Sequence, residues 1–268
     1  MPLQASEASV EQERNTEAVR AAYHRALEEA GPSPVERAWR QGRFDRGLRL
    51  ARELEQHLPT LEGLDLLDMG MSHGGDTAAL ASRGARVTGL DYVDMGMQPL
   101  RDELAGLASV QALRADLNRP FPLKDASFDG MISMCVIEHV GDLDRFYAEC
   151  RRVLRPGGWI LLVTPLALRS VRSDAHFHVP LISVLPMRQR KWIAQTLLKR
   201  PYRYELADKT FYNIDSVARA AHRQGLQHEG RVYAERRFFE NLGRVPGGGI
   251  AQRIVRYWLA DYVFLRRT

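Results

Sequence analysis

The sequence predicts an α/β fold built on a doubly wound, mostly parallel β-sheet. Between residues 60 and 165, short apolar runs alternate with helical segments, which is the pattern of consecutive βαβ units. The runs are almost continuously apolar, as expected for strands that helices cover on both faces. With 268 residues, the chain is also long enough to bury a large core around such a sheet.

Two polar helical segments precede this alternation and predict an N-terminal helical cap over residues 1–59. The first spans residues 8–30 and stops at a turn rich in glycine and proline. The second spans residues 35–54, although Gly42 and Gly47 disfavour a helix there. We expect both helices to lean on the domain that follows.

The predicted core domain, residues 60–165, holds five strands and three helices in alternation. Strands are expected at residues 64–70, 86–90, 109–116, 130–135 and 159–165, and helices at residues 75–83, 95–107 and 142–153. In such a sheet, ligands bind at the carboxyl ends of the strands. The residues that follow each strand are therefore the candidates for a binding site.

Beyond the fifth strand the alternation stops, which predicts two further segments. Residues 166–212 contain several prolines and an expected helix near 187–199, and we interpret them as an insertion that forms a lid. Residues 213–268 begin with a helix, continue with a strand and end on alternating apolar residues. We expect this last segment to complete the sheet.

Charge is unevenly distributed along the chain. The net charge is +5, yet residues 165–268 carry +11 and residues 1–164 carry −6. A basic C-terminal third either faces an anionic partner, such as a phosphate, an acidic glycan, lipid headgroups or nucleic acid, or is simply a solvated surface. The two cysteines, the polar N-terminus and the lack of an apolar run of ~20 residues favour a cytoplasmic protein.

A glycine-rich turn between the first strand and the first core helix is a local signal for a ligand site. Gly70 allows a tight turn, and Gly74 and Gly75 let backbone approach a ligand at the helix N-terminus. Asp68 precedes the turn, where a carboxylate is badly placed beside a pyrophosphate. It suits a cofactor that carries ammonium and sulfonium charges.

Acidic residues also end the next two strands. Asp91 follows the second strand, 21 residues after Gly70, where it can accept hydrogen bonds from both hydroxyls of a ribose. Asp116 ends the third strand and can accept from an adenine amino group, while Leu117 offers the ring an apolar face. Three acidic strand ends at this spacing predict a cofactor that contains a nucleoside.

These motifs resemble those of the class I S-adenosylmethionine-dependent methyltransferases, type 11 small-molecule subfamily. The resemblance covers residues 60–165 and rests on LLDMGMSHGG, VTGLDY, RADLNRPFPLKDASFDGMISMCVIEHV and ECRRVLRPGGWILLVTP. It implies a Rossmann-like, seven-stranded, mostly parallel sheet with S-adenosyl-L-methionine as cofactor. One departure is Ser72, where the family prefers glycine.

The resemblance implies ten cofactor-binding residues, which lie at four strand ends. They are Asp68, Gly70, Met71, Ser72 and Gly74 after the first strand, Asp91 and Tyr92 after the second, Asp116 and Leu117 after the third, and Met134 at the fourth. The first group is expected at the methionyl end of the cofactor, the second at the ribose and the third at the adenine. The residue at the fourth strand is expected near the sulfonium.

Methyl transfer to a hydroxyl requires alignment of donor and acceptor, and a group that removes the proton. Histidine suits that role near neutral pH. The catalytic candidates are His139, which follows the fourth strand, and His176 with Asp174 in the insertion; the alternatives are a structural role in the turn and packing in the lid. No metal site is expected, because Cys135 replaces the first glutamate of the Glu-x-x-Glu-His run that binds a divalent metal in the resembling ubiquinone O-methyltransferases.

Residues 185–200 are basic and amphipathic, and Trp192 lies among them. Such a segment either makes peripheral contact with a membrane surface or covers the active site as a lid, and its length of about three turns favours the lid. The pattern around it loosely resembles the lid of methyltransferases associated with bacterial cell-surface polysaccharides.

The predicted function is O-methylation of a small molecule or a glycan, including acidic, phosphorylated or lipid-linked sugars. One alternative is a natural-product or quinone-type methyltransferase with an aromatic acceptor. Another is a catalytically inactive, cofactor-binding partner subunit. A nucleic-acid acceptor is disfavoured, because residues 133–136 read SMCV and lack the Asn/Asp-Pro-Pro-aromatic motif of base-flipping amino methylases.

Overall fold

A computed structural model describes most of the chain. The described residues are 7–29, 31, 34–56, 58–93, 97–164, 166–167, 181–199, 211, 213–229 and 262–268. They divide into two compact units, Met1–Ile132 and Ser133–Thr268. The division into a cap, a core, a lid and a C-terminal segment stays a prediction.

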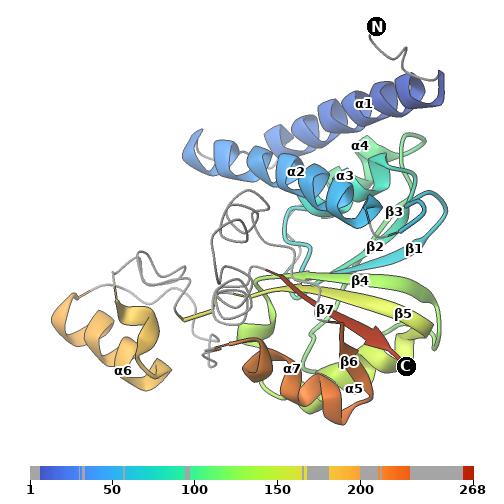
Figure 1. Ribbon diagram of the computed structural model, residues 1–268. Coiled ribbons are helices and arrows are strands. Elements are labelled where there is room, and N and C mark those ends of the chain that lie inside the picture. The colour runs from blue at the N-terminus through green and yellow to red at the C-terminus, as the bar shows by residue number, and fades with distance from the viewer. Residues whose placement is uncertain are drawn as a thin grey trace, which may run out of the picture. The chain divides into compact units, whose positions relative to one another are not determined.

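Seven strands form one sheet in the order β3-β2-β1-β4-β5-β7-β6 (Figure 1). The strands are β1 (Asp65–Met69), β2 (Arg86–Asp91), β3 (Val110–Arg114), β4 (Phe128–Met134), β5 (Leu154–Val163), β6 (Leu226–His228) and β7 (Tyr262–Arg267). The pairs of β2 with β1 and β3 are parallel, whereas β7 runs antiparallel to β5 and β6. The predicted Rossmann-like, mostly parallel sheet is confirmed.

In the first unit, three parallel strands set the positions of the predicted binding residues. Met69 pairs with Leu90, and Asp91 pairs with Arg114, so the carboxyl ends of β1, β2 and β3 are aligned. Helix α3 (Gly75–Ser82) follows β1, and helix α4 (Met97–Leu104) follows β2. The predicted alternation is present here.

Helices α1 (Glu7–Glu29) and α2 (Pro34–Glu55) pack against α3 in the same unit (Figure 1). Their apolar side chains share one buried cluster with those of α3, α4 and β3. The cluster comprises Val19, Ala22, Tyr23, Ala26, Leu27, Phe44, Leu48, Met71, Ala78, Ala79, Leu100, Leu104 and Ala112. The two N-terminal helices are therefore part of the core of this unit.

Helix α2 continues without interruption through Gly42 and Gly47. A Cβ atom at Gly47 would lie 2.6 Å from the Cβ of Ala79 and 2.8 Å from the Cα of Asp76, so only glycine allows α2 to come this close to α3. A Cβ atom at Gly42 would meet nothing within 4 Å. Close packing at Gly47 thus outweighs the low helix propensity that the sequence suggested.

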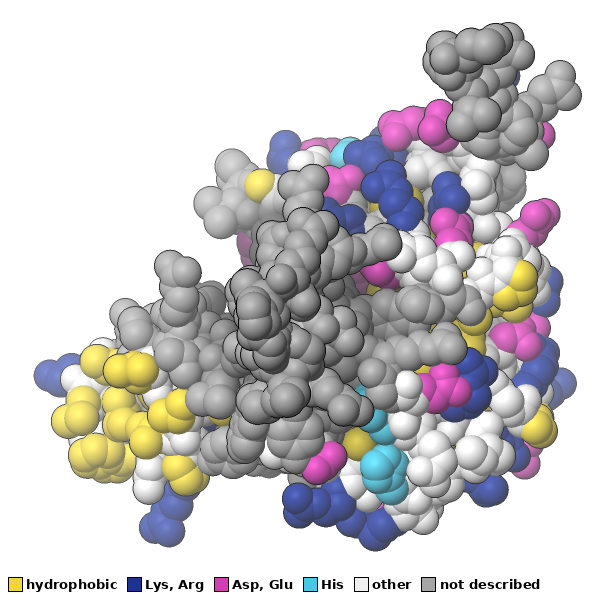
Figure 2. Space-filling view, in the orientation of Figure 1, with side chains coloured by type: hydrophobic (Ala, Val, Ile, Leu, Met, Phe, Trp, Pro, Cys, Tyr) yellow, Lys and Arg dark blue, Asp and Glu magenta, His cyan; other side chains and the backbone are white. Residues whose placement is uncertain are grey.

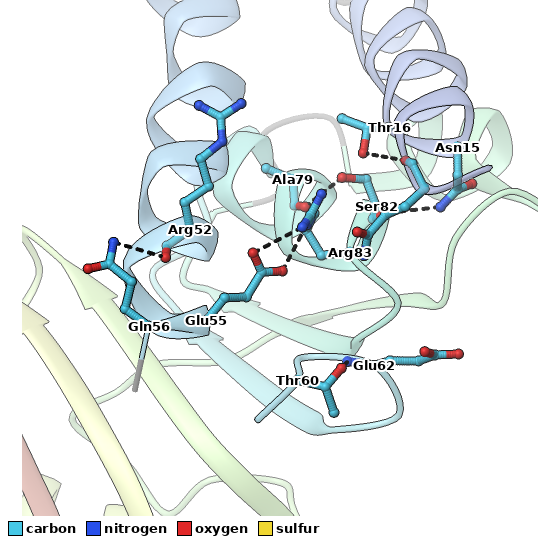
Figure 3. Close-up of polar contacts among 11 residues, drawn as sticks. Asn15, Thr16, Arg52, Glu55, Gln56, Thr60, Glu62, Ala79, Ser82 and Arg83 are labelled. Atoms are coloured by element: carbon cyan, nitrogen blue, oxygen red, sulfur yellow. Dashed lines mark hydrogen bonds and ion pairs between the residues drawn. The ribbon is translucent and has the colours of Figure 1, made fainter. Parts of the chain in front are cut away.

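Polar contacts fasten the end of α3 to both N-terminal helices (Figure 3). The side-chain amide of Asn15 donates to the carbonyl of Ser82 at 2.9 Å. Arg83 donates two hydrogen bonds to the carboxylate of Glu55, at 2.9 and 3.0 Å. These contacts hold the chain in place where it leaves α3 for β2.

The second unit packs helices α5 (Leu143–Val153) and α7 (Ile214–Arg223) together beside its strands. The buried Tyr147 of α5 donates from its hydroxyl to the carbonyl of Val217, at 3.3 Å. On β5 and β7, the rings of Trp159 and Phe264 stack with centroids 5.8 Å apart. The C-terminal residues therefore extend the sheet, as expected.

The helix expected near residues 187–199 has two parts. Helix α6 (Met187–Trp192) follows a 3-10 turn, η2 (Ile182–Val184), and passes into a π-helical turn, η3 (Ile193–Leu197). Buried Ile182 and Ala194 form a small separate core between them. In the part of the chain that the structure describes, every helix is too short or too polar to cross a bilayer.

Candidate active site

The turn that follows β1 closes onto the neighbouring strand β2. The N–H groups of Gly70 and Met71 both donate to the carbonyl of Leu90, at 2.8 and 3.0 Å. Gly70 and Gly74 adopt φ angles of 80° and 71°, which favour glycine. The predicted tight turn is present, and α3 begins directly after it at Gly75.

Asp91, the last residue of β2, is bonded to this turn. Its half-buried carboxylate accepts hydrogen bonds from the N–H of Ser72 at 2.7 Å and the N–H of Val93 at 3.0 Å. A carboxylate has about four acceptor positions. The two backbone donors therefore fix its orientation and leave acceptor capacity for the hydroxyls of a ligand.

Ser72 stands in a left-handed backbone conformation, with φ of 53°. A non-glycine residue in this region carries strain on the order of 1 kcal/mol, which agrees with the preference for glycine in the resembling family. Its hydroxyl lies 3.0 Å from Nδ1 of His73. Burial, followed by the charges of Arg40 and Arg43, lowers the pKa of His73 to about 4, so this ring is neutral at pH 7.

A buried charged network lies next to the turn. Asp68, at the end of β1, accepts from the hydroxyl of Thr77 at 2.6 Å. Asp76, in the first turn of α3, pairs with Arg46 of α2 through both Nε, at 3.0 Å, and Nη2. Burial and then the charge of Asp76 raise the pKa of Asp68 to about 7, while the Thr77 hydroxyl, Arg46 and Arg43 oppose this shift. Helix α2 thus supplies positive charge to two carboxylates beside the turn.

Two predicted cofactor-binding side chains point into the protein. Asp68 and Met71 are each only 2% exposed. Met71 lies over Gly89 so closely that a Cβ atom at Gly89 would collide with its Sδ. The carboxylate of Asp68 bonds Thr77 in α3, and the backbone N–H and carbonyl of Met71 bond Leu90 and Gly74. A cofactor contact for either residue stays a prediction.

The residues after β3 form a compact turn of their own. The carboxylate of Asp116 accepts from the backbone N–H and the side-chain amide of Asn118, at 2.9 and 3.1 Å. Asp116 is half-buried, and Leu117 beside it is buried. Tyr92, after β2, is exposed. The predicted roles of Asp116 and Leu117 at adenine, and of Tyr92 nearby, remain untested by this geometry.

In the second unit, the ends of β4 and β5 meet through a buried carboxylate. Glu138, in the 3-10 turn η1 (Ile137–His139), accepts from the hydroxyl of Thr164 at 3.0 Å. Burial raises the pKa of Glu138 to about 7, although its own backbone N–H and the Thr164 hydroxyl oppose the shift. Met134, at the end of β4, is buried, and His139 is half-buried. A sulfonium contact for Met134 and a base role for His139 stay predictions.

The sequence of residues 67–162 matches the family model described as a methyltransferase domain. Residues 67–162 belong to the type 11 methyltransferase family. A probable S-adenosylmethionine-dependent methyltransferase from Mycolicibacterium smegmatis is 38% identical over 103 residues, which cover 38% of each chain. A ubiquinone biosynthesis O-methyltransferase from Sinorhizobium medicae is 36% identical over 104 residues, covering 39% of this chain and 42% of that one. The chain thus aligns with about two fifths of these relatives.

A solved S-adenosylmethionine-dependent methyltransferase from Mesorhizobium loti has the same fold as this chain. The TM-score is 0.53 at 21% identity, and the alignment covers 82% of this chain and 95% of that one. The predicted fold is therefore confirmed, and the family model that matches residues 67–162 confirms the predicted family for that part of the chain.

The remaining predictions about the site concern Asp174, His176 and Cys135. The catalytic candidates Asp174 and His176 lie outside the described residues. Cys135, in place of the metal-binding glutamate, is exposed with φ of 60°. Among the residues that the structure describes, no three His, Cys, Asp or Glu side chains gather as metal ligands.

One cleft of about 680 Å³ in the second unit contains none of the predicted site residues. Its lining comes from the turn before α5, the start of α5, Phe211 and α7: Gly141, Asp142, Leu143, Asp144, Phe211, Ser216, Arg219, Ala220 and Arg223. We do not assign the methyl-transfer site to this cleft, because the strand-end carboxylates do not line it.

The sequence did not predict the contacts that support the turn of the methyltransferase domain. Arg46 and Asp76 form the ion pair, and Thr77 holds Asp68. Only one weak feature of the sequence pointed to these contacts. Two arginines, at 43 and 46, lie one turn apart on a helix expected to pack on the domain.

Proposed function

We propose that this chain is an S-adenosylmethionine-dependent methyltransferase that acts on a small-molecule acceptor. The observation that carries the proposal is the Asp91 carboxylate, held by the N–H of Ser72 at the carboxyl end of β2. This arrangement adjoins a glycine turn and a helix N-terminus, which suits a nucleoside cofactor. The family of residues 67–162 supports the same activity.

The residues present fit this cofactor by the chemistry of their donors and acceptors. Asp91 keeps acceptor positions for the two ribose hydroxyls, and Asp116 keeps them for an adenine amino group. A role for Asp68 at the positively charged methionyl part stays a prediction, because its carboxylate is buried against Thr77. Leu117 and exposed Tyr92 supply apolar and aromatic surface for the adenine ring.

The bound cofactor supplies a methyl group already activated by a sulfonium leaving group. The protein's own part is to align the acceptor with that methyl group, to exclude water and to take a proton from a hydroxyl acceptor. His139 is the described candidate for that proton, because it is half-buried at the end of β4 beside Glu138. His176 and Asp174 are proposed for the same step from the insertion.

For the acceptor, we propose the hydroxyl of a sugar or glycan that carries acid or phosphate. The charge of +11 over residues 165–268 supports an anionic acceptor. Part of that charge is used internally, since Arg223 pairs with Asp144 and Arg266 pairs with Glu229. Arg190 and Arg267 likewise donate to backbone carbonyls.

A quinone-type aromatic acceptor is the second candidate. The similarity to a ubiquinone biosynthesis O-methyltransferase favours it. Cys135 disfavours it, because this residue stands in place of a glutamate of the metal-binding run that such enzymes carry. A third possibility is an inactive partner subunit that binds cofactor without turnover.

Cofactor binding is the first test, measured by titration calorimetry with S-adenosylmethionine. Asp91→Ala should weaken binding by about 1–3 kcal/mol, the cost of leaving buried hydrogen-bonding groups unpaired. The matched control is Asp102→Ala, because Asp102 is an exposed carboxylate on α4 of the same unit. An unchanged dissociation constant for Asp91→Ala would remove the main support for the proposed site.

Turnover is the second test, measured as S-adenosylhomocysteine release with sugar nucleotides, lipid-linked glycans and phenolic or quinol acceptors. Release with the first two groups alone supports the glycan proposal, and release with quinols alone overturns it. His139→Ala should lower turnover far more than cofactor affinity. Tight cofactor binding without release from any acceptor would favour the partner-subunit alternative.

A further inference from the structure

We propose that residues 181–199, here called the α6 surface, dock onto the anionic face of a lipid bilayer. Nine large hydrophobic side chains are exposed in the described part of the chain, and five of them lie in this short segment. These are Leu181, Val184, Trp192, Leu197 and Leu198. An exposed apolar cluster of this kind marks an interaction site, because soluble surfaces normally carry such residues singly.

Figure 2 shows hydrophobic side chains gathered over α6, with Lys and Arg side chains at the margin of the cluster. Leu181 is 64% exposed, Leu197 is 61% exposed and Trp192 is 57% exposed. Tryptophan has an apolar ring with one polar N–H, and it is enriched where hydrocarbon meets the headgroup layer of a membrane. The composition of the α6 surface therefore suits shallow insertion into an interface.

A buried arginine holds this surface in shape. Arg190 donates from Nε to the carbonyl of Leu185 at 2.7 Å, and from Nη2 to the carbonyl of Ser183. The Ser183 hydroxyl donates in turn to the carbonyl of Ala167, at 2.7 Å. The exposed side chains thus project from a fixed frame, so docking orders little additional backbone.

The positive charge of the α6 surface favours an anionic bilayer as its partner. Residues 181–199 contain four basic residues and no Asp or Glu. Arg188 and Lys199 are exposed, and Arg188 lies four residues before Trp192 on the same side of the helix. Anionic headgroups complement this charge, with roughly a fivefold gain in affinity for each basic residue near the surface. A second copy of the chain would instead bring like charges together.

The inference is independent of the proposed methyl transfer, because no predicted cofactor-binding residue belongs to the α6 surface. It is tested on the full chain by sedimentation with phosphatidylcholine vesicles, with and without an equal share of phosphatidylglycerol. We expect binding to the mixed vesicles and little to phosphatidylcholine alone. Salt near 1 M should weaken it, since the Debye length falls to ~3 Å.

Two double variants separate the two contributions. Arg188→Gln with Lys199→Gln should lower partitioning about 25-fold, from two charges at roughly fivefold each. Trp192→Gln with Leu197→Gln should lower it about tenfold or more, because two apolar side chains no longer enter the interface. Wild-type tryptophan fluorescence should shift to the blue with mixed vesicles, and Trp192→Phe should remove that shift.

The controls change the same kinds of residue elsewhere. Arg14→Gln with Lys124→Gln removes the same charge from exposed sites of the first unit, and Leu107→Gln removes an exposed apolar side chain. Both should bind vesicles like wild type, and thermal unfolding by circular dichroism should confirm that every variant folds.

The proposal is overturned if the wild-type chain does not bind mixed vesicles, or if the charge control loses as much binding as the α6 charge variant. Self-association by sedimentation velocity that only Trp192→Gln with Leu197→Gln abolishes, without vesicle binding, would assign the surface to a second copy instead.

Discussion

Two buried carboxylates, Asp68 in the first unit and Glu138 in the second, occupy similar positions and have different surroundings. Each lies at or just after the end of a strand and accepts from a threonine hydroxyl, Thr77 for Asp68 and Thr164 for Glu138. Burial is the largest cause of a raised pKa in both. At Asp68 the Thr77 hydroxyl and then Arg46 and Arg43 oppose that shift, whereas hydrogen-bond donors alone oppose it at Glu138.

The difference shows how helix α2 changes the charges around a buried carboxylate. The pKa of each carboxyl is raised to about 7, but at Asp68 the charges of Arg46 and Arg43 on α2 offset part of the effect of burial and of Asp76, and Arg46 also pairs with Asp76. At Glu138, the effect of burial is opposed by its own backbone N–H and by the Thr164 hydroxyl. The protonation of Asp68 near neutral pH therefore depends on the charges that helix α2 supplies, and that of Glu138 on burial and hydrogen bonds. Three substitutions test this difference, in order of expected effect.

Arg46→Ala should lower the free energy of unfolding by about 3–5 kcal/mol, because it leaves the buried Asp76 carboxylate without its partner. Urea denaturation measures the loss. The control is Arg86→Ala, which breaks the more exposed pair with Asp65 and should cost under about 1 kcal/mol. Equal losses in the two variants would show that the network beside the turn is not specially stabilising.

Glu138→Gln should make the protein more stable at high pH. Burial raises the pKa of Glu138 from 4.5 to about 7, so the native state binds this proton more tightly than the unfolded state. Stability from the neutral carboxyl is therefore lost as pH rises from about 4.5 through 7. The variant should gain about 3 kcal/mol at pH 8 and under about 1 kcal/mol at pH 5.

Urea denaturation at the two pH values checks this gain. Asp68→Asn is the contrasting variant. It should gain less at pH 8, because removing this carboxylate also removes its attraction to Arg46 and Arg43. A similar rise at pH 8 in both variants would abolish the distinction between the two carboxylates.

Gly47→Ala should lower the free energy of unfolding by about 1–3 kcal/mol, because the added Cβ pushes α2 away from Asp76 and Ala79. Gly42→Ala, in the same helix but facing open space, should raise it by up to about 1 kcal/mol through better helix propensity. If the close approach of α2 supports the site, thermal unfolding should show stability changes of opposite sign for Gly47→Ala and Gly42→Ala. Shifts of the same sign would contradict that role.

The fold and the glycine turn after β1 were largely predictable because their signals are local. Apolar runs of strand length, helical spacing and a glycine turn at 70–74 place the core elements within five residues of their observed ends, with the largest difference at the start of β5, Leu154 instead of the expected Trp159. The aligned strand ends also follow, since parallel strands joined by helices end on one side of a sheet. The direction of individual side chains was not predictable from these patterns. Met71 belongs to the predicted binding set, yet its side chain is buried over Gly89.

By itself, the sequence determined the α/β class, the methyltransferase family of residues 67–162 and the order of acidic strand ends, because periodicity and short motifs reside in neighbouring residues. Only the tertiary structure decided that Arg46 meets Asp76, 30 residues away, and that Glu138 meets Thr164, 26 residues away. Such contacts depend on which face of a helix packs inward and how closely it approaches. Local patterns leave both open.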